Sequence, residues 1–291
     1  MINKRLNKNA RKVDKFLLYF LKNQKKSTLV APMKYGVISG GKKIRTTIIF
    51  DSGKLLNIKE KKLIDICAAV ECIHSYSLIH DDLPCMDNDA MRRGKPSTHK
   101  KFGEATAVLA GNSLLTLAFE IISNKKNLLS LKQKNEIIKL LCNCAGHTGI
   151  AGGQDLDLKY EKKNKFLNQI INMQRKKTGK LFKFCVQSAS IIGNKSKSEN
   201  IRFGKLGEEI GLLFQLSDDF LDLKGSKKLV GKPIKKDKKK GKSTLIKLMG
   251  YENALRYADN LMKKILIKLK KHGKNANNLI ETIKFIRGRS F

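Results

Sequence analysis

The sequence predicts an all-α protein, and three observations lead to this prediction. Only four of the 291 residues are proline. The long segments carry apolar residues three and four positions apart, which is the period of a helix, more often than in the strict alternation of a strand. There is also no fixed-period repeat and no clean linker. We therefore expect one helical domain that spans residues 1–291.

Taken in order, the apolar periodicity predicts nine helices, and glycine or lysine clusters separate several of them. The expected helices span residues 7–23, 35–56, 59–80, 103–122, 131–145, 166–192, 198–222, 251–271 and 276–286. The expected loops lie at Gly40-Gly41 and at residues 87–100, 146–161 and 224–242.

The composition is strongly basic, with 61 Lys and Arg against 25 Asp and Glu and a net charge of +36. Such a surface attracts polyanions, but the lysines are spread from end to end, which indicates a general compositional bias. Tryptophan is absent and no nucleic-acid-binding module is evident. We therefore expect no specific nucleic-acid partner.

The cysteines and the apolar runs indicate in which compartment of the cell the protein is found. Six cysteines at irregular spacings indicate reduced thiols. The basic N-terminus lacks a small-residue cleavage site, and no uninterrupted apolar run is long enough to span a bilayer. The expectation is a soluble cytoplasmic protein that is not an integral membrane protein.

The segment LIHDDLPCMDNDAMRRGKP, residues 78–96, gathers acidic side chains in this basic chain. His74, Ser77 or Leu78, and Asp81 share one face of the expected helix. Pro84 then disturbs the helix, so that Asp87 can turn back toward Asp81 and Asp82. Three carboxylates could converge there, and a cation would relieve their mutual repulsion.

The segment QLSDDFLD repeats this pattern further along the chain. Gln215, Asp218 or Asp219, and Asp222 again form one helical stripe. Gly204, Gly207 and Gly211 precede it and would permit close helix packing.

Oxygen ligands on helices, without paired His or nearby Cys, favour a hard cation such as Mg²⁺. A single cluster of this kind is as readily a helix cap or a solvated patch, but two of them favour metal binding.

Basic residues complement the acidic clusters. Arg92 and Arg93 follow the first cluster directly, and GGKKIR places Lys42 and Arg45 after the flexible Gly40-Gly41 turn. Arginine offers a planar fork and lysine a point charge for phosphate oxygens. Together these residues predict a site for two phosphorylated ligands, one of them bridged by metal.

These motifs resemble those of the trans-isoprenyl diphosphate synthases, and most closely the bacterial farnesyl diphosphate synthases. The matching segments occur in the family's order over nearly the whole chain: MKYGVISGGKKIR, AAVECIHSYSLIHDDLPCMDNDAMRRGKPSTHKKFGEATAVLAGNSLL, GGQDLDL, KKTGKLF, and GEEIGLLFQLSDDFLD followed by GKPIKKDKKKGKST. The first aspartate motif has the long bacterial form, with four residues between Asp82 and Asp87.

The resemblance implies the isoprenoid synthase fold, with long, mostly antiparallel helices around a central catalytic cavity, usually in a homodimer. It implies two to three Mg²⁺ ions, with Mn²⁺ as a possible substitute, and condensation of isopentenyl diphosphate with dimethylallyl or geranyl diphosphate through an allylic carbocation.

The resemblance also assigns roles to individual residues. The Mg²⁺ ligands are Asp81, Asp87 and Asp218, supported by Asp82, Asp219 and Asp222. The residues that bind the allylic diphosphate are Arg92, Lys177, Lys232 and Lys242. Those that bind isopentenyl diphosphate are Lys42, Arg45, His74 and Arg93. Thr178 and Gln215 present oxygen atoms near the cation, and Asp89 has no metal role.

Product length depends on the side chains one turn before the first motif, which are Tyr76 and Ser77. The small Ser77 admits more than two isoprene units and the bulky Tyr76 discourages very long chains. Farnesyl diphosphate is therefore the first expectation and geranylgeranyl diphosphate the second.

Two departures from the family pattern are expected to lower the affinity for substrate but not to change the class of reaction. GGKKIRT lacks the usual proline after Arg45, and Gly288 predicts a looser C-terminal tail.

Other classes of protein fit less well. A class I terpene cyclase normally lacks the second aspartate cluster and does not need GGK. A metal phosphohydrolase built on His80-Asp81 would require further spaced histidines. A regulatory small subunit of the same family would have lost an aspartate motif, and both are present.

Overall fold

The computed structural model describes residues 2–24, 26–161, 163, 165–224 and 244–289. It is 78% helical with almost no strand, which confirms the predicted all-α class. In the described residues the strands are β1 (Met91–Arg92) and β2 (Lys95–Pro96), which pair antiparallel just after the first aspartate motif.

The chain forms two compact units, residues 1–50 with 59–134 and residues 51–58 with 135–291. Each is described by itself below. The expectation of one domain over residues 1–291 stays a prediction.

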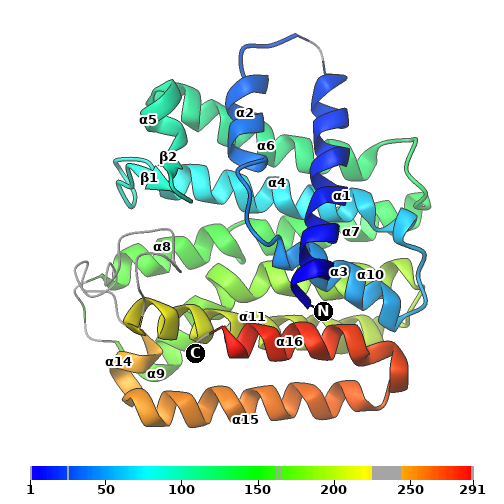
Figure 1. Ribbon diagram of the computed structural model, residues 1–291, viewed down its shortest axis with the longest axis vertical. Coiled ribbons are helices and arrows are strands. Elements are labelled where there is room, and N and C mark those ends of the chain that lie inside the picture. The colour runs from blue at the N-terminus through cyan, green and yellow to red at the C-terminus, as the bar shows by residue number, and fades with distance from the viewer. Residues whose placement is uncertain (1, 25, 162, 164, 225–243, 290–291) are drawn as a thin grey trace. The chain divides into compact units, whose positions relative to one another are not determined.

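The first unit is built on two long helices that pack against each other, α4 (Ile64–Asp81) and α6 (Glu104–Ser123) (Figure 1). Its other elements are α1 (Ile2–Lys22), α2 (Val30–Val37), the start of α3 (Ile44–Leu55), η1 (Glu60–Lys62) and α5 (Thr98–Phe102). Helix α1 is amphipathic: Leu6, Val13 and Leu17 are fully buried along one stripe, and α1 packs that stripe into the unit.

Helix α4 is buried on nearly every side from Asp65 to Ser75, as expected of a helix inside a core. Helix α6 is long and apolar enough to cross a membrane, by length and composition only. A core helix meets the same criteria, and α6 packs against α4 with residues such as Ala107, Leu114 and Ile121 fully buried.

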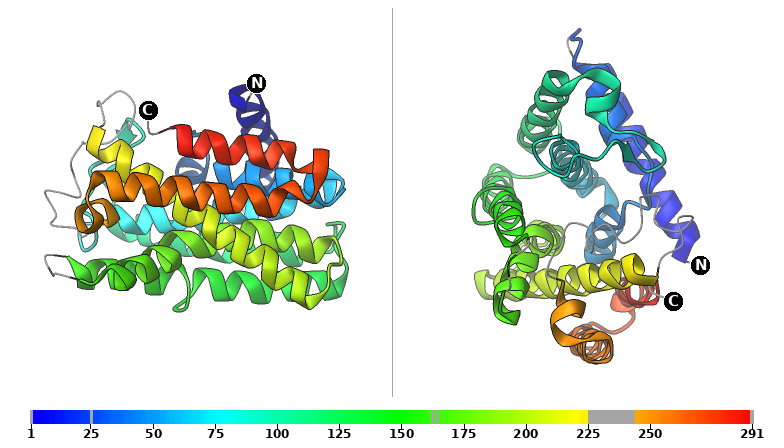
Figure 2. Two further views of the ribbon diagram at one scale, coloured as in Figure 1. Left: turned by 90° about the horizontal axis from the view of Figure 1, so that it is seen from below. Right: turned by 90° about the vertical axis from the view of Figure 1, so that its left-hand side faces the viewer.

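The second unit centres on α10 (Lys180–Ile192) and α11 (Lys197–Lys224), which pack along each other. Helices α15 (Tyr251–Lys270) and α16 (Asn277–Gly288) lie side by side and contact α11 (Figures 1 and 2). The remaining elements are α7 (Leu131–Ala145), which begins in the first unit, α8 (Ile150–Tyr160), α9 (Leu167–Gln174), a π-helical turn η2 (Arg175–Gly179), α14 (Leu245–Met249) and η3 (Gly273–Ala276).

The structure corrects two of the sequence predictions. The expected helix 35–56 is broken into α2 and α3, because Gly40, Gly41 and Lys43 adopt positive φ angles of 81°, 95° and 40°. The expected loop 146–161 contains helix α8. Gly288 is the last residue of α16, and a looser tail after it stays a prediction.

The glycines of α11 pack as the sequence predicted. A Cβ on Gly207 would lie 2.5 Å from the Phe182 carbonyl oxygen, and one on Gly211 would lie 2.7 Å from the Gly179 Cα. Helices α10 and α11 can therefore approach this closely only because those side chains are absent.

We expect Asp65→Asn to stabilise the protein at neutral pH. Burial raises the pKa of Asp65 from 3.8 to about 6, while its own backbone N–H and Lys134 partly oppose this shift. Because the native state then holds its proton more tightly than the unfolded state, the contribution of Asp65 to stability falls as pH rises from about 4 to about 6. The variant avoids this loss, about 1 to 2 kcal/mol after allowance for partial solvent screening.

Urea unfolding at pH 4 and pH 8 measures this effect. The variant should exceed the natural protein in stability at pH 8 and lose that advantage at pH 4. An advantage of equal size at both pH values would contradict it.

Candidate active site

The first aspartate motif begins where helix α4 ends. Asp81 is the last residue of the helix, and the chain then folds back on itself. The Asp87 N–H donates to the Asp81 carbonyl at 2.8 Å, and the Asp89 N–H donates to the Asp82 carbonyl at 3.1 Å. These two bonds bring Asp87 back to the end of α4, as the position of Pro84 predicted.

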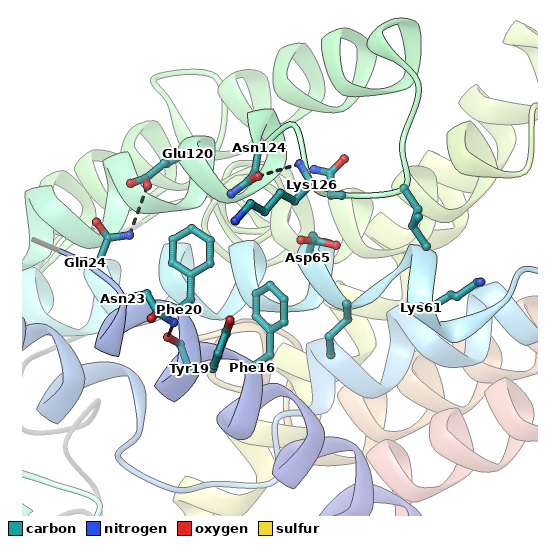
Figure 3. A pocket seen from close by; sticks show the side chains of 13 residues that line it. Phe16, Tyr19, Phe20, Asn23, Gln24, Lys61, Asp65, Glu120, Asn124 and Lys126 are labelled. Carbon is teal, nitrogen blue, oxygen red and sulfur yellow. Dashed lines mark hydrogen bonds between the residues drawn. The ribbon is translucent and has the colours of Figure 1, made fainter.

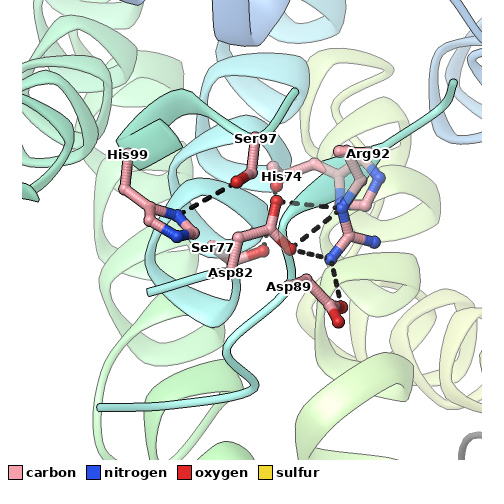
Figure 4. Close-up of polar contacts among 7 residues, drawn as sticks. All are labelled: His74, Ser77, Asp82, Asp89, Arg92, Ser97 and His99. Atoms are coloured by element: carbon pink, nitrogen blue, oxygen red, sulfur yellow. Dashed lines mark hydrogen bonds and ion pairs between the residues drawn. The ribbon is translucent and has the colours of Figure 1, made fainter. Parts of the chain in front are cut away.

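Asp82 is 2% exposed and faces Arg92 (Figure 4). The Arg92 Nε donates to both Asp82 carboxylate oxygens at 3.0 Å, and Nη2 donates to one of them. Asp89 lies 3.6 Å from the same guanidinium. Burial alone would lower the pKa of Arg92, but the hydrogen bond and charge of Asp82 outweigh burial and raise it. Asp82 and Asp89 therefore hold Arg92 charged and in place.

The carboxylates of this motif divide into two groups. Within the described residues, no three His, Cys, Asp or Glu side chains are grouped so that they could hold a metal ion. The expected convergence of three carboxylates is thus not preformed, because Asp82 faces Arg92. Asp81 and Asp87 supply two more carboxylates at the end of α4, and one or two carboxylates with waters and substrate phosphates are the usual Mg²⁺ ligands. These residues therefore fit the predicted cation.

Arg93 is fixed by the glycine turn. Its Nη1 donates to the Ser39 Oγ at 2.9 Å and to the Gly40 carbonyl at 2.6 Å. A Cβ on Gly41 would lie 3.0 Å from the Arg93 guanidinium carbon, so a larger residue would crowd it. The Gly40-Gly41 turn and Arg93 are therefore in direct contact, and Lys42 beside them is exposed.

His74 lies in a strongly positive environment. Burial, followed by the charges of Arg45, Arg93, Lys43 and Arg92, lowers the pKa of His74 well below its usual value. The ring is therefore neutral near pH 7. His74 therefore lies within the electrostatic influence of both Arg45 and Arg93.

The second aspartate motif lies on α11, where Asp219 is held from two sides. Gln215 Nε2 donates to one carboxylate oxygen of Asp219 at 2.9 Å, and Gln174 Nε2 donates to the other at 3.2 Å. Thr178 Oγ1 in turn donates to Gln215 Oε1 at 2.7 Å. The expected neighbours Thr178 and Gln215 are therefore in direct contact, and Asp219 serves this network.

Asp218 interacts with the C-terminal end of the chain. The Arg289 Nη2 donates to Asp218 Oδ1 at 3.0 Å, and the Arg289 guanidinium lies 4.3 Å from the centre of the Phe214 ring. Asp222 lies one turn after Asp218 on the same continuous helix, as the spacing predicted. The contact with Arg289 was not predicted, because the two residues are 71 positions apart.

Lys177 sits in the π-helical turn η2 and pairs with Asp157 of α8, with 2.6 Å between Nζ and Oδ2. A Cβ on Gly153 would lie 2.2 Å from the Lys177 backbone nitrogen, so this glycine allows α8 to approach the turn. The sequence prediction missed Asp157 because it assigned residues 146–161 to a loop. The four-residue spacing of Gly153 and Asp157 was the available signal.

Tyr76 and Ser77, the expected chain-length residues, lie on the last turns of α4. Tyr76 packs edge-on against His80, and burial followed by the charge of Asp81 raises the pKa of its phenol. Ser77 is half-buried and donates to the His74 carbonyl at 2.9 Å. Lys232 and Lys242, the other residues expected to bind the allylic diphosphate, lie outside the described residues.

Comparison with known proteins gives a consistent result. The family model for polyprenyl synthetase matches residues 26–283. The farnesyl diphosphate synthase of Escherichia coli is 41% identical over 236 residues, which cover 80% of this chain and 79% of that protein.

Two solved structures extend the comparison. The FPP/GFPP synthase of Zymomonas mobilis has a TM-score of 0.88 at 34% identity, with 98% of each chain covered. The geranyltransferase of Helicobacter pylori, solved with magnesium and isoprenyl diphosphate, has a TM-score of 0.82 at 31% identity and covers 98% of this chain and 96% of its own.

These comparisons confirm the predicted resemblance, the isoprenoid synthase fold and the prenyltransferase class. They favour elongation to farnesyl diphosphate, with geranylgeranyl diphosphate as the weaker alternative. A match over residues 26–283, together with relatives of this identity and coverage, shows that the chain belongs to the polyprenyl synthetase family.

Proposed function

We propose that this protein condenses isopentenyl diphosphate with dimethylallyl and geranyl diphosphates to give farnesyl diphosphate. The observation that supports this best is the shared construction of the two aspartate motifs. In each, the buried aspartate is held by neighbouring side chains, Asp82 by Arg92 and Asp219 by Gln174 and Gln215. The others, Asp81 and Asp87 in one motif and Asp218 in the other, are the proposed Mg²⁺ ligands, and Asp222 supports them. At Asp218 a metal ion would compete with Arg289, which donates to the same carboxylate.

The Helicobacter pylori geranyltransferase was solved with magnesium and isoprenyl diphosphate, which supports dependence on Mg²⁺. We propose two to three Mg²⁺ ions, replaceable by Mn²⁺, whose charge would stabilise the diphosphate as it leaves. Arg92, Lys177, Lys232 and Lys242 would bind the same diphosphate. Arg92 is suited to this role because its guanidinium is already charged and held by two carboxylates.

Isopentenyl diphosphate would be held by Lys42, Arg45, His74 and Arg93. Because the His74 ring is neutral, it would donate one N–H to the diphosphate while the arginines supply the charge. The double bond of isopentenyl diphosphate then attacks the allylic cation, and a proton is lost. The oxygens of Thr178 and Gln215 would lie near the cation and stabilise it.

We further propose that the protein acts as a cytoplasmic homodimer, in keeping with its family. The test of the main proposal is incubation with isopentenyl and dimethylallyl diphosphates and Mg²⁺, followed by chromatography of the dephosphorylated products. We expect farnesol. A cyclic hydrocarbon from a single substrate would instead indicate a terpene cyclase, and the absence of any prenyl product would refute the proposal.

We expect Ser77→Phe to shorten the product to geranyl diphosphate. Ser77 lies one turn before the first aspartate motif, and a phenyl group there would fill the space that the growing chain needs. Chromatography of the variant's products measures this, with Ser77→Ala as the control of unchanged bulk. If Ser77→Phe still made farnesyl diphosphate as its main product, Ser77 would not set chain length.

The second candidate product is geranylgeranyl diphosphate, which the small side chain of Ser77 would also admit. In that case the natural protein would convert farnesyl diphosphate further when given excess isopentenyl diphosphate.

A further inference from the structure

A pocket of about 680 Å³ lies in the first unit, among the last turns of α1, the start of α4 and the end of α6 (Figure 3). This volume is in the range of small-molecule sites. Its lining includes Asp65, whereas the first aspartate motif begins at Asp81, at the other end of α4. At 1.5 Å per residue, the two aspartates are about 24 Å apart along the helix. The residues of the pocket therefore take no part in the proposed condensation.

Asp65 is the unusual residue of this pocket. It is 9% exposed, and no Lys, Arg or His nitrogen of the described chain lies within 4.0 Å of its carboxylate. Its position in the first turn of α4 suits the helix dipole, which accounts for an acidic residue there but not for its burial. Burial of this carboxylate is unfavourable and raises its pKa, and the charge of Lys134 offsets this only in part, because the Lys134 ammonium donates to the Asn124 carbonyl instead. A cationic ligand would supply a closer positive charge.

The wall opposite this carboxylate is aromatic. Phe16 and Phe20, one turn apart on α1, are stacked with ring centres 6.0 Å apart, and both rings point into the pocket (Figure 3). Ring faces attract cations and also pack against apolar groups. The pocket thus offers a carboxylate for a positive charge and rings for the apolar body that carries it.

Other charged side chains of the pocket limit what it can accept. Glu120 is engaged by Gln24, whose amide donates to it at 3.2 Å. Lys61 points away from Asp65, while Lys126 extends over the pocket without pairing with that carboxylate (Figure 3). The positive charge of Lys126 would repel a bound cation, so Lys126 would act as a competitor of the ligand.

We propose that this pocket binds a small organic ammonium ion with an apolar body, with Asp65 as its counter-ion and Phe16 and Phe20 as its apolar wall. The inference stands on the pocket itself and does not depend on the proposed function.

Isothermal titration calorimetry with 2-phenylethylammonium chloride tests the proposal, and 2-phenylethanol serves as the neutral ligand of the same shape. A ligand of this size is expected to bind with a Kd on the order of 1 mM. The alcohol should bind at least about tenfold more weakly, since it cannot pair with the carboxylate. Equal binding of the two ligands, or no binding of the amine, would overturn the proposal.

Two substitutions in the pocket should act in opposite directions. Asp65→Asn should weaken binding of the amine about tenfold, and Lys126→Ala should strengthen it about twofold to threefold by removing the competitor. Asp155→Asn, at an exposed carboxylate paired with Lys159, is the matched control and should change nothing. If Asp65→Asn bound the amine normally, the carboxylate would be only a helix-start residue.

A third variant tests the aromatic wall independently of the charge on Asp65. Phe16→Leu keeps an apolar side chain but removes the ring, and should weaken binding of the amine about threefold. Circular dichroism would verify that each variant is helical. Unchanged binding by Phe16→Leu together with weaker binding by Lys126→Ala would also refute the site.

Discussion

Replacing Asp81 with asparagine is expected to lower kcat/KM for prenyl transfer about a thousandfold while leaving the fold intact. The substitution keeps the shape of the side chain and removes the negative charge that would bind Mg²⁺. Loss of one group that stabilises developing charge typically lowers the rate a hundredfold to a thousandfold. A loss of this size corresponds to about 4 kcal/mol of transition-state stabilisation.

The measurement is steady-state kinetics over a range of Mg²⁺ concentrations, with urea unfolding to verify stability. Asp155→Asn is again the control, because Asp155 is an exposed aspartate that pairs only with Lys159 among the described ion pairs. Asp81→Asn should also need more Mg²⁺ for half-maximal activity. If its kcat/KM stayed within threefold of the natural protein, Asp81 would not be a metal ligand.

Breaking the pair between Asp82 and Arg92 is expected to have the largest effect on stability. Both side chains are almost inaccessible, with 3% and 11% of their surfaces exposed. Asp82→Ala would leave the Arg92 guanidinium buried beside Asp89 alone, and loss of one partner from a buried pair destabilises by about 3 kcal/mol. Arg92→Ala should have a similar effect by leaving Asp82 uncompensated.

A double-mutant cycle separates the pair from its surroundings. The variant with both substitutions should be less destabilised than the sum of the two single variants, by about 2 kcal/mol. The same cycle on Lys159 and Asp155, with 65% and 57% of their side chains exposed, should give a coupling below about 0.5 kcal/mol. Equal coupling energies for the two pairs would mean that burial does not strengthen the pair between Asp82 and Arg92.

Local periodicity predicted the helices that carry the two aspartate motifs, because both α4 and α11 have their functional side chains on one repeating stripe. The spacing also predicted that Asp87 returns to Asp81, since Pro84 disrupts the helix between them. It did not predict that Asp82 pairs with Arg92. That pairing depends on the position of Arg92, which the short sheet of β1 and β2 fixes.

The features that the sequence could not predict depend on contacts between distant segments. The glycines at 149, 152 and 153 led to the prediction of a loop. Gly153 instead lies within helix α8, where it allows close packing against the backbone of Lys177. The pairing of Arg289 with Asp218 joins segments without a shared local pattern. Asp65 likewise resembles an ordinary helix-start residue until its burial and its pocket are known.

The π-helical turn η2 joins α9 to α10, and the number of residues in this segment fixes how the two helices are rotated relative to each other. A turn with one additional residue shifts the helical phase of everything after it by about 100°. The apolar stripe of α9 and that of α10 are therefore out of register with each other, and each matches its own neighbours only while the extra residue is present. Lys177 and Thr178 lie within that turn. Insertion or deletion of one residue between 167 and 192 would therefore rotate one of these stripes away from its neighbours.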